Sequence, residues 1–339
     1  MCSLHETRRI LVTLASPFRE PFGIGRPADR YVEVIRKLAP NDWEFLIPNR
    51  CDESELCRLV KDADGILGVG IGRKVIEAAD SLRIIQVIGS GFESVDVEAA
   101  AEKGIVVCNA PQLPAQAVAE HVFALMLGLA KNIVRHDNRT RKGLWQPCPS
   151  LPLKGRTLGV VGLGSIGVEV AIRAKAFGMN VMAIKKQPSN ELKESLGLRM
   201  LGSDKDLLEV LQESDIVVLS ARHSEKTRGM IGQKQLQSMK KEALLINVSR
   251  GGIIDEKALI EALRNRELAG AGLDVFEKEP IEPDNPLLSL DNVLLTPHVA
   301  GAVLLSEPGW SDAVSFYVRN IQSLFSGETP ENIVNAKRP

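Results

Sequence analysis

Short, continuous apolar runs rich in valine and isoleucine recur along this chain, and stretches with helical periodicity separate them. Asp204–Gln212 and Glu256–Arg264 are two clear helical stretches. Most of the apolar runs do not alternate with polar residues, which is typical of strands buried on both faces of a parallel sheet. This alternation of strand and helix predicts a doubly wound α/β architecture. The expected strands are Ile10–Leu14, Gly65–Val69, Ile84–Ile88, Ile105–Cys108, Leu158–Val161, Val181–Ile184, Ile216–Leu219, Leu244–Val248, Ala271–Val275 and Val293–Thr296.

The chain has 339 residues, which is more than a single hydrophobic core usually serves, so its length predicts two domains. Ala115–Lys131 has the pattern of a long apolar helix, and a polar stretch with prolines follows it. Near the other end, Ser306–Gly309 interrupts the pattern before a final helix expected over Ser311–Phe325.

The strands of the first third of the chain need a helix to close over them, and the C-terminal helix is available. We therefore expect a discontinuous first domain, residues 1–111 and 307–339, with a second domain, residues 112–306, inserted between its parts.

A glycine-rich loop, Gly162–Gly167, joins the expected strand Leu158–Val161 to a stretch of helical spacing, Val168–Phe177. The first glycine permits the tight turn, the second lets the backbone approach a pyrophosphate, and the third allows close packing of helix on strand. The helix N-terminus adds free N–H groups and a partial positive charge. A glycine-rich turn alone is a weak signal, but the order of strand, loop and helix predicts a Rossmann-type dinucleotide site. Its expected contacts are Gly162, Gly164, Ser165, Ile166 and Gly167.

The second strand of such a domain usually ends, about 20 residues after the loop, in an acid that binds the ribose hydroxyls. Met179–Asn190 contains no carboxylate and places Lys185 and Lys186 there. A lysine pair can neutralise a 2′-phosphate, whereas a solvated basic turn would have no role in binding. Both interpretations remain open, and the first adds the two lysines to the cofactor contacts. We expect NADP or NAD, with NADP slightly favoured.

Three further segments follow expected strands on the carboxyl side of the sheet, where ligands bind in open α/β folds. They are Asn247–Gly252, Asp274–Pro280 and Thr296–His298. Hydride transfer to a keto acid needs a cation for the carboxylate and a proton donor for the developing alkoxide. Arg250 suits the first task because its planar fork matches a carboxylate. An arginine that merely caps a turn is the alternative.

The proton donor can be sought among the five histidines of the sequence. Histidine titrates near neutrality, and a neighbouring carboxylate can hold it protonated. His298 follows a strand and a proline that fixes the local backbone, so it is the expected acid/base residue. His223, on a loop after a strand, is the reserve candidate. His121 and His136 are expected to be packing or surface residues, and His5 to lie in a disordered tail.

The bulk composition excludes several classes of partner. With a net charge of −1, no electrostatic field favours nucleic acid or an anionic membrane. The longest helical apolar run, Val122–Ala130, falls far short of the roughly 20 residues that cross a bilayer. The apolar stretch that follows Arg8 and Arg9 is brief, so a first strand is preferred to a signal peptide. The five cysteines have no metal-like spacing, which indicates reduced thiols in a cytoplasmic protein without a metal site.

Taken together, these segments closely resemble the D-isomer-specific 2-hydroxyacid dehydrogenase family over nearly the whole chain. The resemblance is specific because several independent motifs occur in the family's order. In the first half it rests on Val87–Asp96, Gly104–Pro111 and Val118–His121. In the second half it rests on the glycine loop, Ser249–Gly251, Gly272–Phe276, Glu279–Pro280 and Thr296–His298.

The resemblance implies two doubly wound parallel-sheet domains, a Rossmann-type nucleotide domain inserted into a flavodoxin-like substrate domain. It also implies an NAD(P)-dependent oxidoreductase that transfers a hydride between the cofactor and a small 2-keto or D-2-hydroxy acid. Glyoxylate or hydroxypyruvate reductases and phosphoglycerate dehydrogenases are the members it resembles. The family further implies a homodimer, with Ala115–Lys131 and the arm through Trp145 at the interface.

The resemblance assigns roles to individual residues. Arg250 would bind the substrate carboxylate and carbonyl, His298 would be the acid/base residue, and Glu279 would pair with His298. Ser249 and Asp274 would contact the cofactor, with Asp274 at its nicotinamide end. The remaining implied contacts are backbone amides around Ser90 and Gly91, which would hold the substrate carboxylate.

Four departures from related sequences narrow these expectations. The loop Ser220–His223 replaces a His-Cys-Pro-like turn beside the adenosine, which leaves that contact open and adds Arg222 to the basic character nearby. Val303 stands where a threonine is common. Ser90 in place of lysine argues against phosphite, and Glu279 in place of glutamine argues against formate.

Two questions stay open. A nicotinamide-sensing corepressor on the same fold is the alternative function, and the absence of long disordered tails weighs against it. The identity of the acid depends on how loops such as Phe18–Arg26 and Gly68–Arg73 close over the site.

Overall fold

The computed structural model of the chain describes residues 7–14, 27–50 and 52–335. They fall into two compact units, a first unit within residues 1–114 and 302–339 and a second unit of residues 115–301. The sequence placed these boundaries a few residues away, after 111 and after 306. The first unit includes residue 304 because Leu304 is buried in one core with Trp310 and Ile88.

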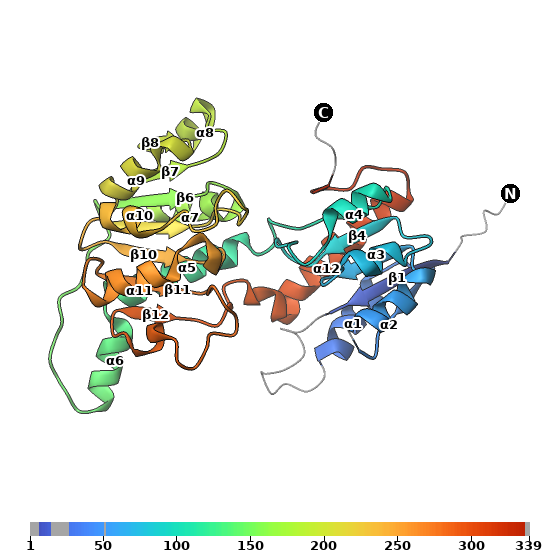
Figure 1. The fold of residues 1–339 in the computed structure, drawn as a ribbon, viewed down its shortest axis with the longest axis horizontal. Coiled ribbons are helices and arrows are strands. Elements are labelled where there is room, and N and C mark those ends of the chain that lie inside the picture. The colour runs from blue at the N-terminus through green and yellow to red at the C-terminus, as the bar shows by residue number, and fades with distance from the viewer. Residues whose placement is uncertain (1–6, 15–26, 51, 336–339) are drawn as a thin grey trace. The chain divides into compact units, whose positions relative to one another are not determined.

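A five-stranded parallel sheet forms the centre of the first unit (Figure 1). Its strand order is β2-β1-β3-β4-β5, the order of flavodoxin-like sheets. Neighbouring side chains on a strand point to opposite faces, and accordingly Ile10 and Leu11 belong to different cores. The strands are β1 Arg8–Thr13, β2 Trp43–Leu46, β3 Gly65–Gly68, β4 Ile84–Val87 and β5 Val106–Cys108.

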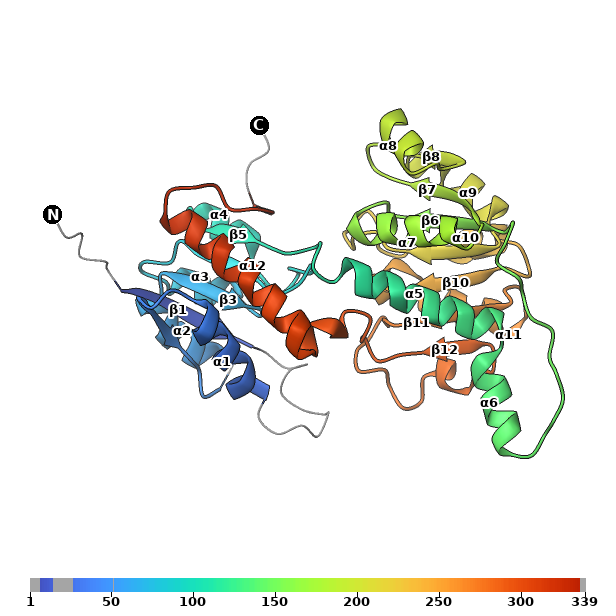
Figure 2. The same cartoon turned by 180° about the vertical axis from the view of Figure 1, so that it is seen from behind.

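Helices cover both faces of this sheet. One core lies under α1 and α12, which lie beside each other in Figure 2, and the Tyr31 and Trp310 rings meet edge to face at 5.0 Å. The other core lies under α2, α3 and α4. The helices are α1 Pro27–Leu38, α2 Glu53–Leu59, α3 Arg73–Glu77, α4 Val97–Glu102 and α12 Glu307–Phe325, with short 3₁₀ turns η2 Val60–Asp62 and η6 Ala302–Leu305.

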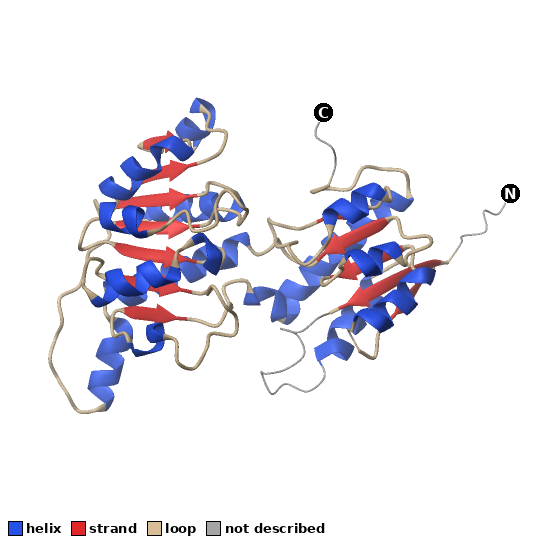
Figure 3. Cartoon of the chain, viewed as in Figure 1, coloured by secondary structure: helices blue, strands red, loops and turns tan. Residues whose placement is uncertain are grey.

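A seven-stranded parallel sheet forms the second unit (Figure 3). Its strand order is β12-β11-β10-β9-β6-β7-β8, which is the Rossmann order extended by one strand. The order reverses between β6 and β9, and ligands of open α/β sheets bind beside such a switch point. The strands are β6 Thr157–Val161, β7 Asn180–Ile184, β8 Met200–Gly202, β9 Ile216–Leu219, β10 Leu244–Asn247, β11 Gly270–Leu273 and β12 Val293–Leu295.

The helices of the second unit also form two layers. Successive residues of β9 alternate between two cores, one under α5, α7 and α8 and the other under α9, α10 and α11. Both sheets are therefore doubly wound, which confirms the predicted α/β fold class. The helices are α5 Ala115–Ala130, α6 Ile133–Arg141, α7 Ser165–Ala176, α8 Asn190–Ser195, α9 Leu207–Glu213, α10 Gln233–Ser238 and α11 Glu256–Arg264, with 3₁₀ turns η3 Asp204–Asp206, η4 Gly251–Ile253 and η5 Pro286–Ser289.

The final helix begins earlier than predicted. Ser306 and Pro308 do not interrupt a pattern but start α12, because the Ser306 hydroxyl accepts a hydrogen bond from the Gly309 N–H at 3.3 Å. Pro308 lies in the first turn, where no backbone N–H is needed.

Among the described residues no single helix is long and apolar enough to cross a membrane. Only α5 and α6 taken together reach that length and composition, and they are bent by 58° at the break between them.

Candidate active site

The glycine loop after β6 is folded as a tight turn. Gly162 has a φ of +105°, and a Cβ added to it would lie 2.4 Å from the backbone of Ala221. A Cβ on Gly167 would lie 2.4 Å from the carbonyl oxygen of Gly162. Both glycines are therefore required by close backbone packing between the loop, the turn after β9 and the start of α7.

The middle glycine of the loop differs from these two. A Cβ added to Gly164 would meet no atom within 4 Å, so the backbone there faces open space. Gly164 is the N-cap of α7, and the amides of Ser165, Ile166 and Gly167 in the first turn have no intrahelical acceptor. An open glycine followed by unpaired helix amides fits the binding of a pyrophosphate.

The two lysines at the end of β7 differ in their surroundings. The ammonium of Lys185 donates a hydrogen bond to the carbonyl of Leu163 at 2.8 Å, within the glycine loop. Lys186 is exposed. Lys185 thus supports the loop directly, while Lys186 leaves its charge in solvent.

The turn after β10 carries Arg250. The side chain of Asn247 holds this turn, since its Oδ1 accepts from the Ser249 N–H at 3.1 Å and hydroxyl at 2.8 Å, and its Nδ2 donates to the Arg250 carbonyl at 3.1 Å. A Cβ on Gly251 would lie 1.9 Å from the backbone of Phe276. The turns after β10 and β11 are therefore in backbone contact.

His298 and Glu279 form a pair. Nδ1 of His298 lies 2.7 Å from Oε2 of Glu279, whose Oε1 accepts from the Phe276 N–H at 3.0 Å. Burial alone would raise the pKa of Glu279, but hydrogen bonds from His298 and Phe276 and the charges of His298 and Arg250 outweigh it and lower that pKa. An ionised carboxylate can only accept, so Nδ1 carries the proton and Nε2 is left to face a ligand.

Asp274 holds the loop that carries His298. Its buried carboxylate accepts from the N–H groups of Val299 and Ala300, both at 2.9 Å, and from the Thr296 hydroxyl at 2.6 Å. The His298 N–H donates to the Asp274 carbonyl at 2.8 Å. Burial would raise the pKa of Asp274. The hydrogen bonds that its carboxylate accepts outweigh burial and lower that pKa; they come from His121, Thr296, Ala300 and Val299. The loop can therefore keep His298 at a φ of +53°.

His121, which was expected to be a packing or surface residue, is half-buried on α5 and makes specific contacts within the second unit. Its Nε2 lies 2.9 Å from the Thr296 hydroxyl and 3.5 Å from the Asp274 carboxylate. Because the hydroxyl proton is donated to Asp274, Nε2 of His121 must carry a proton and donate to Thr296. The contact joins residues 175 positions apart, so no local pattern in the sequence predicted it.

The other histidines lie outside this group. His223 packs against Gly252, and its buried Nε2 has no hydrogen-bond partner within the described residues. His136 is half-buried on α6. His5 and the loop Phe18–Arg26 lie outside the described residues.

Ser90 and Gly91 belong to the first unit and follow β4. The residue before them, Gly89, has a φ of +79°. The remaining predicted site residues all belong to the second unit.

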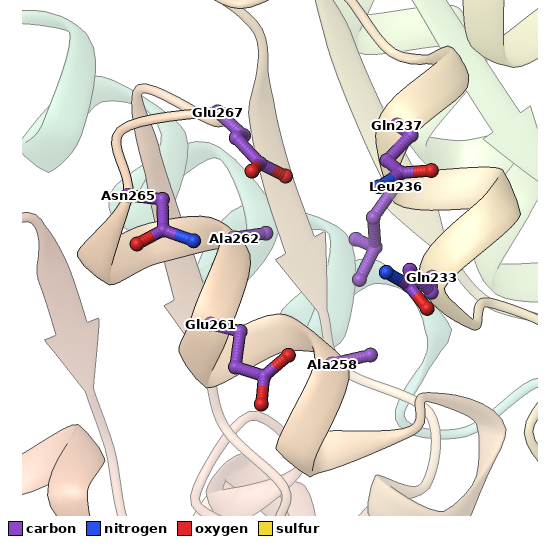
Figure 4. Close-up of a pocket in the computed structure, with 8 residues that line it drawn as sticks. All are labelled: Gln233, Leu236, Gln237, Ala258, Glu261, Ala262, Asn265 and Glu267. Carbon is purple, nitrogen blue, oxygen red and sulfur yellow. The ribbon is translucent and has the colours of Figure 1, made fainter.

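A pocket elsewhere in the second unit lies between α10 and α11, with Gln233, Gln237, Glu261 and Glu267 among its lining residues (Figure 4). It contains none of the predicted site residues. Its two carboxylates would repel an anionic acid or a dinucleotide phosphate.

Comparison with known proteins gives a family and several relatives. The family model described as "D-isomer specific 2-hydroxyacid dehydrogenase, NAD binding domain" matches residues 123–300. The D-3-phosphoglycerate dehydrogenase of Methanocaldococcus jannaschii is 42% identical over 304 residues, which are 88% of this chain and 57% of that protein. The glyoxylate reductase of Korarchaeum cryptofilum is 40% identical over 334 residues, 96% of each chain. This chain thus spans little more than half of the first relative and nearly all of the second.

Among solved structures, the fold is similar to that of an NADPH-dependent glyoxylate/hydroxypyruvate reductase from Sinorhizobium meliloti in complex with NADP and malonate. The TM-score is 0.79 with 31% identity, and the match covers 97% of both chains.

Proposed function

Because this chain belongs to the D-isomer-specific 2-hydroxyacid dehydrogenase family, we propose that it reduces glyoxylate, hydroxypyruvate or a similarly small 2-keto acid to the D-2-hydroxy acid. The observation that carries this proposal is the His298–Glu279 pair at 2.7 Å, with Arg250 near enough for its charge to lower the pKa of Glu279. Reduction of a keto acid requires a proton donor and a cation, and both lie here at the carboxyl edge of the sheet.

Each of these residues has a definite task in the proposed reaction. Arg250 binds the carboxylate and carbonyl of the acid, and His298 gives the proton on Nε2 to the carbonyl oxygen as it becomes an alkoxide. Glu279 orients the imidazole and stabilises its charged form. When bound, the nicotinamide cofactor supplies the hydride. Backbone amides of Ser90 and Gly91 hold the substrate carboxylate.

The glycine loop and the start of α7 are proposed to hold the cofactor's pyrophosphate. Contacts from Gly162, Gly164 and the amides of Ser165–Gly167 are supported by the open space at Gly164. Ser249 and Asp274 are the proposed contacts further along the cofactor. In this proposal residues 112–306 bind the dinucleotide, and residues 1–111 with 307–339 bind the acid.

NADP is proposed to be preferred slightly over NAD. Support comes from the lysines at the end of β7 and from the NADP bound to the S. meliloti reductase. Because Lys185 already donates to the glycine loop, Lys186 is the more selective contact for a 2′-phosphate. Lys186→Asp should lower kcat/KM for NADPH by about 10-fold or more and leave that for NADH nearly unchanged. An unchanged ratio of the two values would remove Lys186 from 2′-phosphate recognition.

A homodimer and a cytoplasmic location complete the proposal. Four apolar residues on α6 and in the segment that follows it are exposed: Ile133, Val134, Leu144 and Trp145, the last by 88%. Exposed apolar residues of this kind mark association surfaces. The cysteines that the structure describes, at positions 57, 108 and 148, are free thiols, which accords with a reducing compartment.

A panel of 2-keto acids assayed with NADPH and with NADH tests the proposed function. The panel includes glyoxylate, hydroxypyruvate and pyruvate, with 3-phosphoglycerate in the oxidative direction. We expect turnover of at least one small 2-keto acid. The corepressor alternative is not favoured, because the relatives and the solved structure named above are reductases and dehydrogenases. Tight cofactor binding without turnover of any acid would contradict the reductase and favour that alternative.

A further inference from the structure

The turn after β4 in the first unit departs from strand geometry in a definite way. Along a strand, successive carbonyls point to alternate sides. The chain leaves strand geometry after β4, where Gly89 has a left-handed φ of +79°. Two consecutive carbonyls then point toward the same neighbour. The carbonyl of Gly89 accepts from the Ala110 N–H at 2.8 Å, and the carbonyl of Ser90 accepts from Nδ2 of Asn109 at 2.7 Å.

These two hydrogen bonds fix the directions of two amides. In a planar trans peptide, the N–H points opposite to the carbonyl of the same peptide unit. The unit that bears the Gly89 carbonyl also bears the Ser90 N–H, and the unit that bears the Ser90 carbonyl also bears the Gly91 N–H. Since both carbonyls face the chain just after β5, both N–H groups face away from it, side by side.

Neither N–H group donates a hydrogen bond to another described residue. Across the part of the chain that the structure describes, the amides of Ser90 and Gly91 have no acceptor. Successive N–H groups that point the same way form a concavity that binds anions.

The side chains that hold this turn are buried. Asn109 is 7% exposed, and because its partner is a carbonyl, its amide nitrogen must be the atom that faces Ser90. Tyr317, on α12, is completely buried, and its hydroxyl accepts a hydrogen bond from the Gly89 N–H at 3.0 Å. The turn is therefore held in place by residues just after β5 and by Tyr317 on the C-terminal helix.

We infer that Asn109 and Tyr317 are positioning residues that aim the Ser90 and Gly91 amides at the carboxylate of the substrate. The inference rests on the proposed function, in which these amides bind that carboxylate. Neither side chain touches the acid. Asn109 acts by keeping the peptide between Ser90 and Gly91 from turning over, and Tyr317 acts by holding Gly89 in its left-handed conformation.

The test uses the full chain with four substitutions. Asn109→Asp and Asn109→Leu remove the donor with and without added charge, and Tyr317→Phe removes a single oxygen. Asn335→Asp is the matched control, because Nδ2 of Asn335 makes the same bond to a carbonyl, that of Ile105 at 2.7 Å, elsewhere in the same unit. KM and kcat are measured with the best 2-keto acid, the Kd of oxamate is measured with cofactor bound, and the cofactor Kd is measured by fluorescence.

Both Asn109 variants should raise KM and the oxamate Kd by about tenfold or more, and Tyr317→Phe by about threefold. In all of them kcat and the cofactor Kd should stay within about twofold of wild type, as should every value for Asn335→Asp. If the Asn109 variants do not fold, Tyr317→Phe alone carries the test.

Two results would overturn the inference while leaving the proposed function intact. One is an active wild type whose Asn109 and Tyr317 variants keep its KM and oxamate Kd, and the other is an equal rise in KM for Asn335→Asp. A wild-type chain that neither reduces a 2-keto acid nor binds oxamate would contradict the inference and the proposed function together.

Discussion

The carboxylate of Glu279 is bonded at both oxygens, by Nδ1 of His298 at 2.7 Å and by the backbone N–H of Phe276 at 3.0 Å. The second bond fixes the carboxylate to the turn after β11, so the carboxylate in turn fixes the imidazole plane. His298 itself stands at a φ of +53°, a conformation that non-glycine residues adopt rarely and at a cost. Both constraints leave Nε2 as the ring nitrogen available to a ligand.

Substitution Glu279→Gln should lower kcat by about 10- to 100-fold, because a neutral amide neither fixes the tautomer of His298 nor stabilises its charged form. The cofactor Kd should change little. Steady-state kinetics with the preferred acid measures the effect. Glu282→Gln, which alters an exposed ion pair with Lys278, is the matched control and should leave kcat unchanged. Equal kcat values for the two variants would remove Glu279 from the reaction.

Two glycines of the loop should respond differently to alanine. Gly164→Ala adds a methyl group to open space, so it should leave the Tm unchanged but raise the cofactor Kd by about tenfold or more, because the methyl group occupies the approach of the pyrophosphate. Gly167→Ala places a Cβ 2.4 Å from the Gly162 carbonyl and should lower the Tm itself. Thermal unfolding and fluorescence titration distinguish the two. A normal cofactor Kd in Gly164→Ala would place the pyrophosphate elsewhere.

Asp274→Asn should destabilise the second unit at pH 7 by about 2–4 kcal/mol, because an amide donor would face the N–H groups of Val299 and Ala300. The folded-state pKa of Asp274 is lowered, so its stabilising contribution is complete above the unfolded pKa of about 3.9 and is lost as the pH falls through the folded pKa. The difference in unfolding free energy between wild type and variant should therefore shrink below about pH 4. Denaturant unfolding at several pH values measures it, and a difference that stays constant down to pH 3 would contradict this role.

The sequence predicted the buried strands well because a short, continuous run of β-branched and other apolar residues is typical of a strand covered on both faces. It missed two edge strands, β2 and β8, although it predicted the edge strands at the opposite ends of the two sheets, β5 and β12. Trp43–Leu46 contains Glu44, and Met200–Gly202 is a short segment that ends in glycine, so neither has the continuous run of β-branched and other apolar residues on which the prediction depended. A strand without such a run is specified by the neighbour with which it pairs, which local periodicity does not report.

Some residues of the candidate site could likewise be placed from the sequence, and others could not. Arg250, Asp274 and His298 could be placed from sequence because each follows a strand of a parallel sheet, and those ends share one edge. The contacts of His121 with Thr296 and of Tyr317 with Gly89 could not, since 175 and 228 residues separate the partners. Hydrogen bonds across such separations depend on the tertiary fold and leave no local pattern.

The most direct test of the account is the kcat of His298→Gln, measured with the preferred 2-keto acid alongside the cofactor Kd. Glutamine is close in size to histidine but cannot donate a proton to an alkoxide at neutral pH. We predict a fall in kcat of about 10³-fold or more with a cofactor Kd within about twofold of wild type. A His298→Gln enzyme that keeps wild-type turnover would contradict it and move the proton donor to His223 or to water.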